Sequence, residues 1–139
     1  MTTEQIKKDR ITVHAVAGLL MRDGKLLVAE RPEGKPYSGY WEFPGGKVED
    51  NETADVAIRR ELHEELGVDA VQAEPWFEHL HAYPDKTVLL DLWRVTEFSG
   101  EPHGRENQVL RWVGYEEILH LRLLAGNLEI LSQIKSLFF

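Results

Sequence analysis

Residues 46–68 read GKVEDNETADVAIRRELHEELGV, and this stretch is the most informative part of the chain. Glu61, Glu64 and Glu65 stand at positions i, i+3 and i+4, so a helix brings the three carboxylates to one side. Like charges so close together repel one another and disfavour the helix unless a cation binds them. Hard divalent cations such as Mg²⁺ take oxygen ligands and commonly join a few carboxylates to the phosphates of a substrate. The stretch therefore predicts a helix that carries a magnesium site.

Short sequence signals mark the limits of this helix. We expect Thr53 to be its N-terminal cap and Gly67 to end it. Apolar residues recur every four positions within it, at Ile58, Leu62 and Leu66. This spacing predicts a buried stripe beside the carboxylate face.

Length, composition and charge limit the class of protein. The chain has 139 residues, and we expect a single domain over residues 1–139. Its formal net charge of −8 argues against a nucleic acid polymer or an acidic membrane as a partner held by a basic surface. The absence of cysteine excludes disulfides, thiol catalysis and zinc-thiolate sites. Residues 1–10 form no apolar signal region and no apolar run is long enough to span a membrane, so we expect a cytoplasmic protein.

The rest of the chain alternates between β-rich and polar segments. We expect strands at residues 11–20, 26–30, 41–43, 71–81, 87–95 and 109–113, with a turn at Pro84-Asp85. One helical turn is expected at 115–119. An amphipathic closing helix is expected at 127–139, with its core face made of Leu128, Leu131, Ile134 and Leu137. Strands mixed with two helices predict an α+β fold in which a mixed sheet lies between helices.

The opening stretch also satisfies a longer pattern, G-x5-E-x7-R-E-U-x-E-E-x-G-U, in which U is apolar. This pattern resembles the signature of the Nudix hydrolases, and the resemblance extends over nearly the whole chain. It implies the α/β/α sandwich of the Nudix fold and the hydrolysis of a phosphoanhydride with Mg²⁺, or with Mn²⁺ in its place. The simpler alternative is a solvated helix face on which Arg60 and Glu64 form an i,i+4 ion pair.

The resemblance implies a role for each residue of the signature. Glu61, Glu64 and Glu65 would bind the metal together with the carbonyl oxygen of Gly45. The ion would neutralise charge on the phosphates and make the attacking water easier to deprotonate. Arg60 is expected to form a supporting salt bridge with Glu52 that orients the site, and direct contact of Glu52 with the metal is the alternative.

Other segments resemble the MutT-type branch of the family, the pyrophosphohydrolases that remove oxidised guanine nucleotides such as 8-oxo-dGTP. These segments are residues 41–49, 83–86 and 100–106, together with Asn127. The resemblance implies that Glu106 reaches the metal site from a distant loop. The catalytic candidates are therefore Glu61, Glu64, Glu106 and Arg60. Which of the carboxylates accepts the proton is left open. The residues expected to contact the substrate are Arg31, Glu42, Phe43, Pro44, Gly45, Lys86 and Asn127. Lys86 stands where the branch has an arginine, and lysine cannot reproduce a planar bidentate contact.

Asn127 is the residue expected to read the base. Position N7 of guanine is a hydrogen-bond acceptor, whereas in 8-oxoguanine it is an N–H donor. An asparagine amide can accept from that N–H with its oxygen and donate to O6 with its nitrogen. With normal guanine one polar group of the amide would be badly paired, and such a mismatch gives large discrimination between 8-oxoguanine and guanine. The alternative for Asn127 is a cap of the closing helix.

Several site residues have a simpler structural alternative. Arg31 would then be a surface arginine, Phe43 a core aromatic and Glu106 a solvated loop acid. His14 is expected in the core. His79 and His81 share a face of one strand, but no third ligand is evident in the sequence, so we do not expect zinc there.

The resemblance implies hydrolysis of 8-oxo-dGTP, and also of 8-oxo-GTP, to the monophosphate and pyrophosphate, which would sanitise the nucleotide pool and prevent mutation. The partner would be a small nucleoside triphosphate, and the protein a monomer or weak homodimer. Three alternatives stay open: a hydrolase of CTP or modified pyrimidine nucleotides, an ADP-ribose hydrolase, and a catalytically silent nucleotide sensor.

Overall fold

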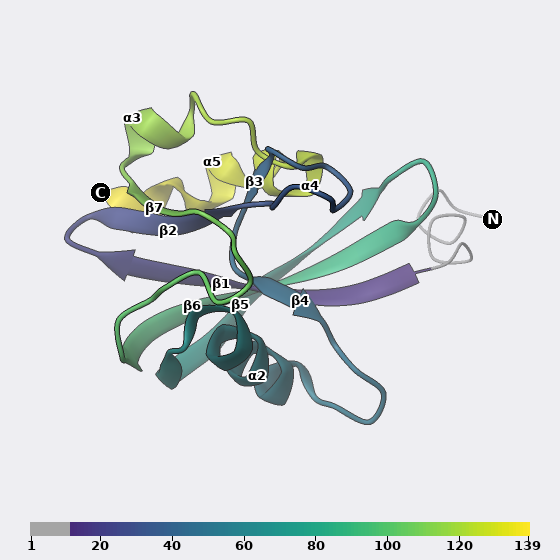
Figure 1. Cartoon of the computed structure of the whole chain (residues 1–139), viewed down its shortest axis with the longest axis horizontal. Helices are drawn as coiled ribbons and strands as arrows, with labels where there is room; N and C mark the ends of the chain where they lie inside the picture. The colour runs from purple at the N-terminus through teal and green to yellow at the C-terminus, as the bar shows by residue number, and fades with distance from the viewer. Residues whose placement is uncertain (1–11) are drawn as a thin grey trace.

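A seven-stranded mixed sheet lies at the centre of the molecule in the computed structural model, which describes residues 12–139 (Figure 1). Ile11, where the first strand is expected to begin, lies outside the described residues. The strands are β1 (Thr12–Arg22), β2 (Lys25–Glu30), β3 (Trp41–Glu42), β4 (Gly45–Lys47), β5 (Asp69–Ala82), β6 (Thr87–Ser99) and β7 (Leu110–Val113). The helical elements are α2 (Ala54–Leu66), α3 (Tyr115–Ile118), α4 (Ala125–Leu128), α5 (Leu131–Ile134) and the 3-10 helix η1 (Lys135–Phe138).

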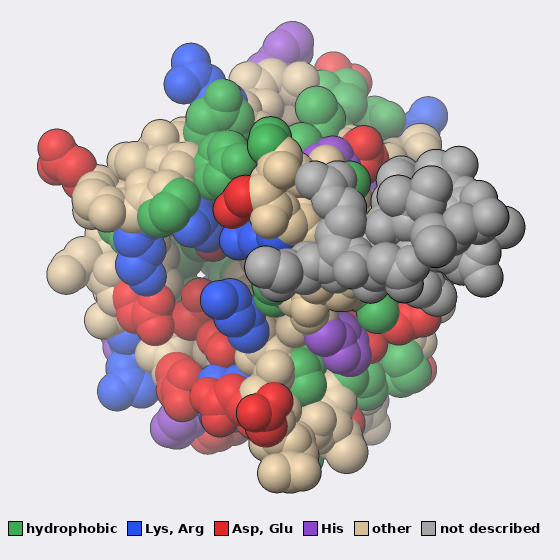
Figure 2. Space-filling model, turned by 90° about the vertical axis from the view of Figure 1, so that its right-hand side faces the viewer, with side chains coloured by type: hydrophobic (Ala, Val, Ile, Leu, Met, Phe, Trp, Pro, Cys, Tyr) green, Lys and Arg blue, Asp and Glu red, His purple; other side chains and the backbone are tan. Residues whose placement is uncertain are grey.

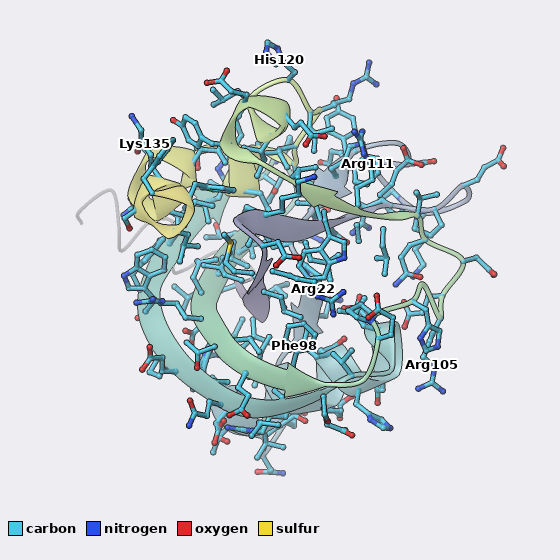
Figure 3. The ribbon with its side chains drawn as sticks, turned by 90° about the vertical axis from the view of Figure 1, so that its left-hand side faces the viewer. Arg22, Phe98, Arg105, Arg111, His120 and Lys135 are labelled. Carbon is cyan, nitrogen blue, oxygen red and sulfur yellow. The ribbon has the colours of Figure 1, made fainter. Side chains whose placement is uncertain are left out.

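Strand β1 joins the two halves of the sheet. It pairs in parallel with β6 and antiparallel with β2 and β4, while β3 and β7 pair with β2. Strands β5 and β6 form a long antiparallel hairpin that curves strongly (Figure 3). Register shifts between Ala70 and Ala73 and between Pro75 and Phe77 accompany the curve, since each irregularity bends and twists its strand. The Pro84-Asp85 turn joins the two strands as predicted, with the Tyr83 N–H donating to the Lys86 carbonyl at 2.7 Å.

Two apolar clusters hold the helices on opposite faces of the sheet. Helix α2 packs on one face, where Ile58 and Leu62 meet Val16 of β1. Helices α3 to α5 cover the other face, where Ile118 and Ile130 belong to a second cluster. Figure 1 shows α2 below the sheet and the shorter helices above it. The predicted α+β fold, an α/β/α sandwich, is therefore present.

Helix α2 begins and ends where the sequence predicts. The Thr53 hydroxyl accepts a hydrogen bond from the Val56 N–H at 3.2 Å, which caps the first turn. Gly67 takes a left-handed conformation with φ of 69°, and its N–H donates to the His63 carbonyl. The predicted stripe is buried, because Ile58, Leu62 and Leu66 are all 0% exposed.

The predicted continuous helix over residues 127–139 is wrong. The segment divides into α4, α5 and η1, and Asn127 lies inside α4 rather than at its cap, which is Leu124. Leu128, predicted in the core, is 53% exposed, whereas Ile130 is fully buried. Tertiary contacts account for the change, since hydrogen bonds from the Phe43 N–H to Asn127 and from the Gly126 N–H to Tyr83 fix α4 separately from α5.

Strand β4 is a second difference, because no strand is expected at residues 45–47. Gly45 pairs with Ala17 of β1, and this pairing depends on glycine. A Cβ atom on Gly45 would lie 1.9 Å from the carbonyl oxygen of Val16.

Among the described residues, no helix is long and apolar enough to cross a membrane.

Candidate active site

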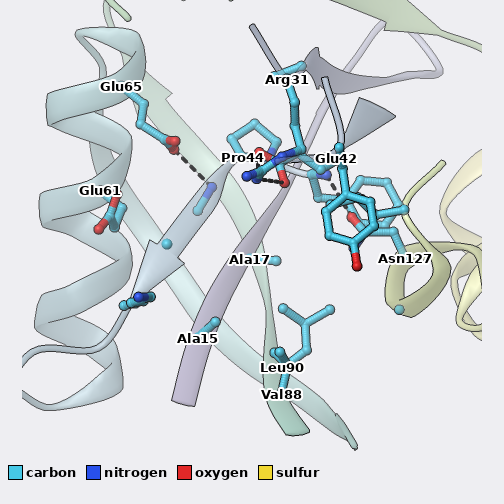
Figure 4. A pocket seen from close by; sticks show the side chains of 18 of the residues that line it. Ala15, Ala17, Arg31, Glu42, Pro44, Glu61, Glu65, Val88, Leu90 and Asn127 are labelled. Carbon is cyan, nitrogen blue, oxygen red and sulfur yellow. Dashed lines mark hydrogen bonds and ion pairs between the residues drawn. The ribbon is translucent and has the colours of Figure 1, made fainter. Parts of the chain in front are cut away.

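Helix α2 and strand β4 bring two of the predicted carboxylates, those of Glu61 and Glu65, to a cavity. The Gly45 N–H donates to Oε2 of Glu65 at 2.9 Å, which ties the helix to the strand (Figure 4). A Cβ atom on Gly46 would lie 2.5 Å from the carboxylate of Glu61. Gly46 is therefore required because the Glu61 carboxylate lies so close, and Gly45 is required because the Val16 carbonyl does.

The cavity has a volume of about 400 Å³ and extends from these carboxylates to α4. It contains most of the residues that the sequence analysis assigns to the site: Arg31, Glu42, Phe43, Pro44, Gly45, Glu61, Glu65, Lys86, Glu106 and Asn127. Acidic and basic side chains lie next to each other on the face shown in Figure 2. Figure 4 shows Glu61 and Glu65 at one end of the cavity, which is the acidic end, and Asn127, the partner of Phe43, at the other.

The acidic end has the electrostatics of a cation site. Burial, together with the charges of Glu61, Glu42 and Glu106, raises the pKa of Glu65 to about 9. Burial also raises the pKa of Glu61, although the Arg60 guanidinium opposes this shift. Several carboxylates in one partly dry cavity repel one another, and a bound divalent cation would remove that repulsion. The oxygen-only donor set fits Mg²⁺ or Mn²⁺.

Arg60 connects the carboxylates of α2 to the loop that precedes the helix. Its guanidinium holds both oxygens of Glu52, with Nε to Oε2 at 2.6 Å and Nη2 to Oε1 at 2.8 Å. Its Nη1 atom donates to Glu61 at 2.9 Å and to Glu64 at 3.1 Å. The hydrogen bond from Arg60 lowers the pKa of Glu52 to about 2. The predicted salt bridge between Arg60 and Glu52 is therefore present, and Arg60 also orients Glu61.

Glu64 differs in position from the other two glutamates of the pattern. Its side chain is 54% exposed, compared with 15% for Glu61, and it does not line the cavity. The i,i+4 pair with Arg60 that the simpler alternative predicts is present at 3.1 Å. Glu64 thus lies at the rim, where it can reach the acidic end only from the solvent side.

Glu106 comes from the loop between β6 and β7. Its carboxylate lies 3.8 Å from the Lys35 ammonium and is 44% exposed. Its charge contributes to the raised pKa values of Glu61 and Glu65, so it lies within electrostatic reach of both. Gln108 holds this loop against α2 by accepting from the Glu106 N–H at 2.8 Å and donating to the Glu65 carbonyl at 3.2 Å. Sequence reasoning did not find Gln108, because a polar residue in a polar loop carries no signal.

Arg31 and Glu42 form one wall of the cavity. The Arg31 Nη1 atom donates to Glu42 at 3.1 Å, and its Nε donates to the Pro36 carbonyl at 2.7 Å. The Arg31 side chain is 23% exposed, so it is held in the wall and is not a free surface arginine. Burial raises the pKa of Glu42, while the charge of Arg31 opposes the shift.

Asn127 and Phe43 meet at the opposite end of the cavity. The Phe43 N–H donates to Oδ1 of Asn127 at 2.8 Å. This bond identifies the oxygen end of the amide, and Nδ2 has no hydrogen bond to any residue of the described range 12–139. Phe43 is 3% exposed and belongs to the core, as its structural alternative predicts, while it still lines the cavity.

Comparison with known proteins gives the family. Residues 12–134 match the family model of the NUDIX domain. The chain belongs to the Nudix hydrolase family. The matched residues include Glu61, Glu64 and Glu65, the paired Gly45 and Gly46 and the Arg60–Glu52 ion pair, and the chain is a Nudix pyrophosphohydrolase.

Relatives of this Nudix protein fall into two groups by substrate name. The CTP pyrophosphohydrolase of Escherichia coli is 37% identical over 125 residues, which cover 90% of this chain and 93% of that protein. The 8-oxo-dGTP diphosphatase of Haemophilus influenzae is 38% identical over 106 residues, which cover 76% of this chain and 78% of that protein. The solution structure of the E. coli ORF135 protein superposes with a TM-score of 0.81 at 35% identity, over 94% of this chain and 93% of that one.

Two predictions about histidines in the Nudix domain need correction. Sequence analysis found no third ligand near His79 and His81, yet both rings lie 2.7 Å from Oε1 of Glu129. No sequence pattern indicates this contact, because Glu129 lies 48 residues beyond His81. His14 is not a core residue, since its side chain is 39% exposed and lies 3.4 Å from Asp91.

Proposed function

We propose that this Nudix pyrophosphohydrolase acts on 8-oxo-dGTP, and also on 8-oxo-GTP, and releases the nucleoside monophosphate and pyrophosphate. The observation that carries the proposal is the Asn127 amide, fixed by the Phe43 N–H at the end of the cavity opposite the carboxylates. The proposed cofactor is Mg²⁺, held by Glu61, Glu64, Glu65, Glu106 and the Gly45 carbonyl. Removal of oxidised nucleotides from the cytoplasmic pool would be the cellular role, and the single domain would act as a monomer or weak homodimer.

The acidic end would hold the triphosphate and its cations. When bound, divalent cations neutralise charge on the phosphates and lower the pKa of the attacking water. Glu61 and Glu65 are oriented for this task, by Arg60 and by the Gly45 N–H respectively. Lys35, which lies 3.8 Å from Glu106, adds a positive charge beside the position of the phosphates. Glu106, which lines the cavity, and the more exposed Glu64 would be candidates to accept a proton from the attacking water.

The base would bind against Phe43 and Asn127. The Asn127 Nδ2 donor is available, and Oδ1 keeps one lone pair after it accepts from Phe43. The base of 8-oxo-dGTP offers an O6 acceptor beside an N7–H donor, which pairs with both atoms of the amide. Guanine offers two acceptors there, and the unpaired Oδ1 contact would cost about 1–3 kcal/mol.

A pyrimidine triphosphate such as CTP is the second candidate. The specific observation in its favour is the E. coli CTP pyrophosphohydrolase, whose likeness covers 90% of this chain. Cytosine also presents a donor beside an acceptor, at N4 and N3, so the Asn127 amide could pair with it. Turnover rates for the two classes of base therefore decide between the candidates.

The Asn127→Asp and Asn127→Ala variants test how the base is read. Aspartate keeps an oxygen for the Phe43 N–H but replaces the Nδ2 donor with an acceptor that faces O6. We expect kcat/KM for 8-oxo-dGTP to fall about 10- to 100-fold in Asn127→Ala, with a smaller fall for dGTP. Asn127→Asp should lower kcat/KM for both nucleotides, because both lose the O6 contact, while the oxygen that pairs with N7–H is kept. Pyrophosphate release measured with each nucleotide gives the two values. A preference for 8-oxo-dGTP that survives undiminished in Asn127→Ala would contradict this role of the amide.

A further inference from the structure

A second group of metal-binding side chains lies outside the catalytic carboxylates. His79 and His81 alternate along β5, so their side chains leave the same face of the strand. Glu129, at the C-terminal end of α4, meets both of them, with Oε1 at 2.7 Å from His79 Nε2 and 2.7 Å from His81 Nδ1. All three ligand atoms lie within 4.8 Å of one another.

We propose that His79, His81 and Glu129 bind one Zn²⁺ ion in a metal site separate from the catalytic carboxylates. Two imidazole nitrogens and one carboxylate oxygen are a ligand set typical of zinc, with bonds of about 2.0–2.2 Å and a water in the remaining position. Such bonds place neighbouring ligand atoms roughly 3.3 Å apart. The ligand atoms of the structure need to separate slightly, which the 46%-exposed side chain of Glu129 permits.

The ligand chemistry separates this site from the catalytic one. The catalytic end of the cavity offers oxygen atoms alone, which suit Mg²⁺. Imidazole suits zinc and its transition-metal neighbours, whereas Mg²⁺ binds it poorly. The two sites also belong to different elements, since α2 and β4 carry the catalytic carboxylates while β5 and α4 carry the histidines and Glu129. Mg²⁺ at ordinary concentrations would therefore not displace zinc from the histidine site.

The site fastens α4 to the sheet beside the proposed base end of the cavity. His81 and Asn127 both line that cavity, and Asn127 stands two residues before Glu129. Tyr83 makes a parallel connection, because its hydroxyl accepts from the Gly126 N–H at 3.2 Å. A zinc ion would replace two hydrogen bonds between β5 and α4 with three coordinate bonds. The expected consequence is a more stable protein in which α4 is held more firmly.

The test needs a protein without a histidine tag and with a weakened catalytic site. In the Glu61→Gln/Glu65→Gln double variant, competition with a chromogenic chelator measures zinc affinity and stoichiometry. We expect one equivalent of Zn²⁺ to bind and millimolar Mg²⁺ not to displace it. Adding His79→Gln or Glu129→Gln should weaken zinc binding at least about tenfold, because each removes a ligand.

Two other histidine variants serve as matched controls. His120 lies beside α3 and points away from the sheet (Figure 3), so His120→Gln should leave zinc affinity unchanged. His14 belongs to a second group, with Glu78 and Asp91. Zinc binding that persists in His79→Gln but disappears in His14→Gln would place the ion there and overturn the proposal, as would a double variant that binds no zinc.

Two further measurements guard against a folding artefact. Circular dichroism should show that the glutamine variants unfold cooperatively. Zn²⁺ should raise the midpoint temperature of unfolding of the double variant, but not that of the variant that also carries His79→Gln. Substitution by Co²⁺ should give the visible absorption bands of a nitrogen-ligated, low-coordinate ion, whereas an octahedral oxygen-ligated spectrum would contradict the proposed ligands. Neither readout depends on turnover, so failure here leaves the proposed hydrolase function untouched.

Discussion

At the scale of single residues, Arg60 has the largest number of charged partners at the site. Its guanidinium holds Glu52 with two bonds and reaches Glu61 and Glu64 with the third nitrogen. A planar fork can make these contacts together, while an ammonium group cannot. The orientation of Glu61 therefore depends on the shape of the arginine and not on its charge alone.

Arg60→Lys is expected to lower kcat/KM about 10- to 100-fold, because Glu61 loses the hydrogen bond from Arg60 that orients its carboxylate. The matched control is Arg59→Lys. Arg59 pairs with Asp55 at 2.8 Å on the exposed side of the same helix, away from the cavity. Steady-state pyrophosphate release with Mg²⁺ measures both variants. Equal losses for the two variants would show that Arg60 supports only the helix and has no separate role in the site.

At the scale of elements, the division of the closing segment places Ile130 in the core and Leu128 at the surface. Ile130→Ala should therefore lower the free energy of unfolding by about 2–5 kcal/mol, as expected for a buried aliphatic side chain. Leu128→Ala should change it by less than about 0.5 kcal/mol. Urea denaturation measures both values. The reverse order of the two losses would support the single continuous helix that the hydrophobic pattern predicts.

Local signals and tertiary contacts explain which elements the sequence could predict. Helix α2 can be predicted from its N-terminal cap, its terminal glycine and its apolar spacing, because all of these signals lie within the helix or at its ends. The closing segment does not, because contacts of Asn127 with Phe43 and of Gly126 with Tyr83 override its periodicity. Strand β4 was missed since two glycines normally indicate a turn.

The same distinction applies to the candidate site. The Arg60–Glu52 pair was predictable because a family pattern fixes its spacing. The contact of Glu129 with His79 and His81 was not, since it joins residues 50 and 48 positions apart. The exposure of Glu64 was also missed, because helical spacing gives the side of the helix but not the depth of the cavity beside it.

At the scale of the whole molecule, the carboxylate cavity makes stability depend on pH and on metal. The pKa of Glu65 is raised to about 9 in the fold, compared with 4.5 for an ordinary glutamate. The folded state therefore holds a proton on Glu65 that the unfolded chain releases. This contribution to stability is fully present below pH 4.5 and is lost as the pH rises towards 9.

Without metal, wild-type protein should become less stable relative to Glu65→Gln as the pH rises from 6 to 8.5, because glutamine carries no titrating group. Added Mg²⁺ should oppose this loss in the wild type, with a larger stabilisation at pH 8.5 than at pH 6, and should have little effect on the variant. Thermal unfolding in EDTA and in Mg²⁺ at the two pH values measures the difference. A Mg²⁺ effect that is equal at both pH values would contradict a protonated Glu65 in the metal-free fold.

We propose that this Nudix enzyme selects an oxidised purine through Asn127. Its most direct test is a competition in which 8-oxo-dGTP, dGTP and CTP are present together at equal concentration with Mg²⁺. Mass spectrometry of the monophosphates formed early in the reaction gives the ratios of kcat/KM. We expect 8-oxo-dGMP in excess of dGMP and CMP by at least about 100-fold. A reaction that yields mainly CMP would contradict it and assign the enzyme to the pyrimidine triphosphates.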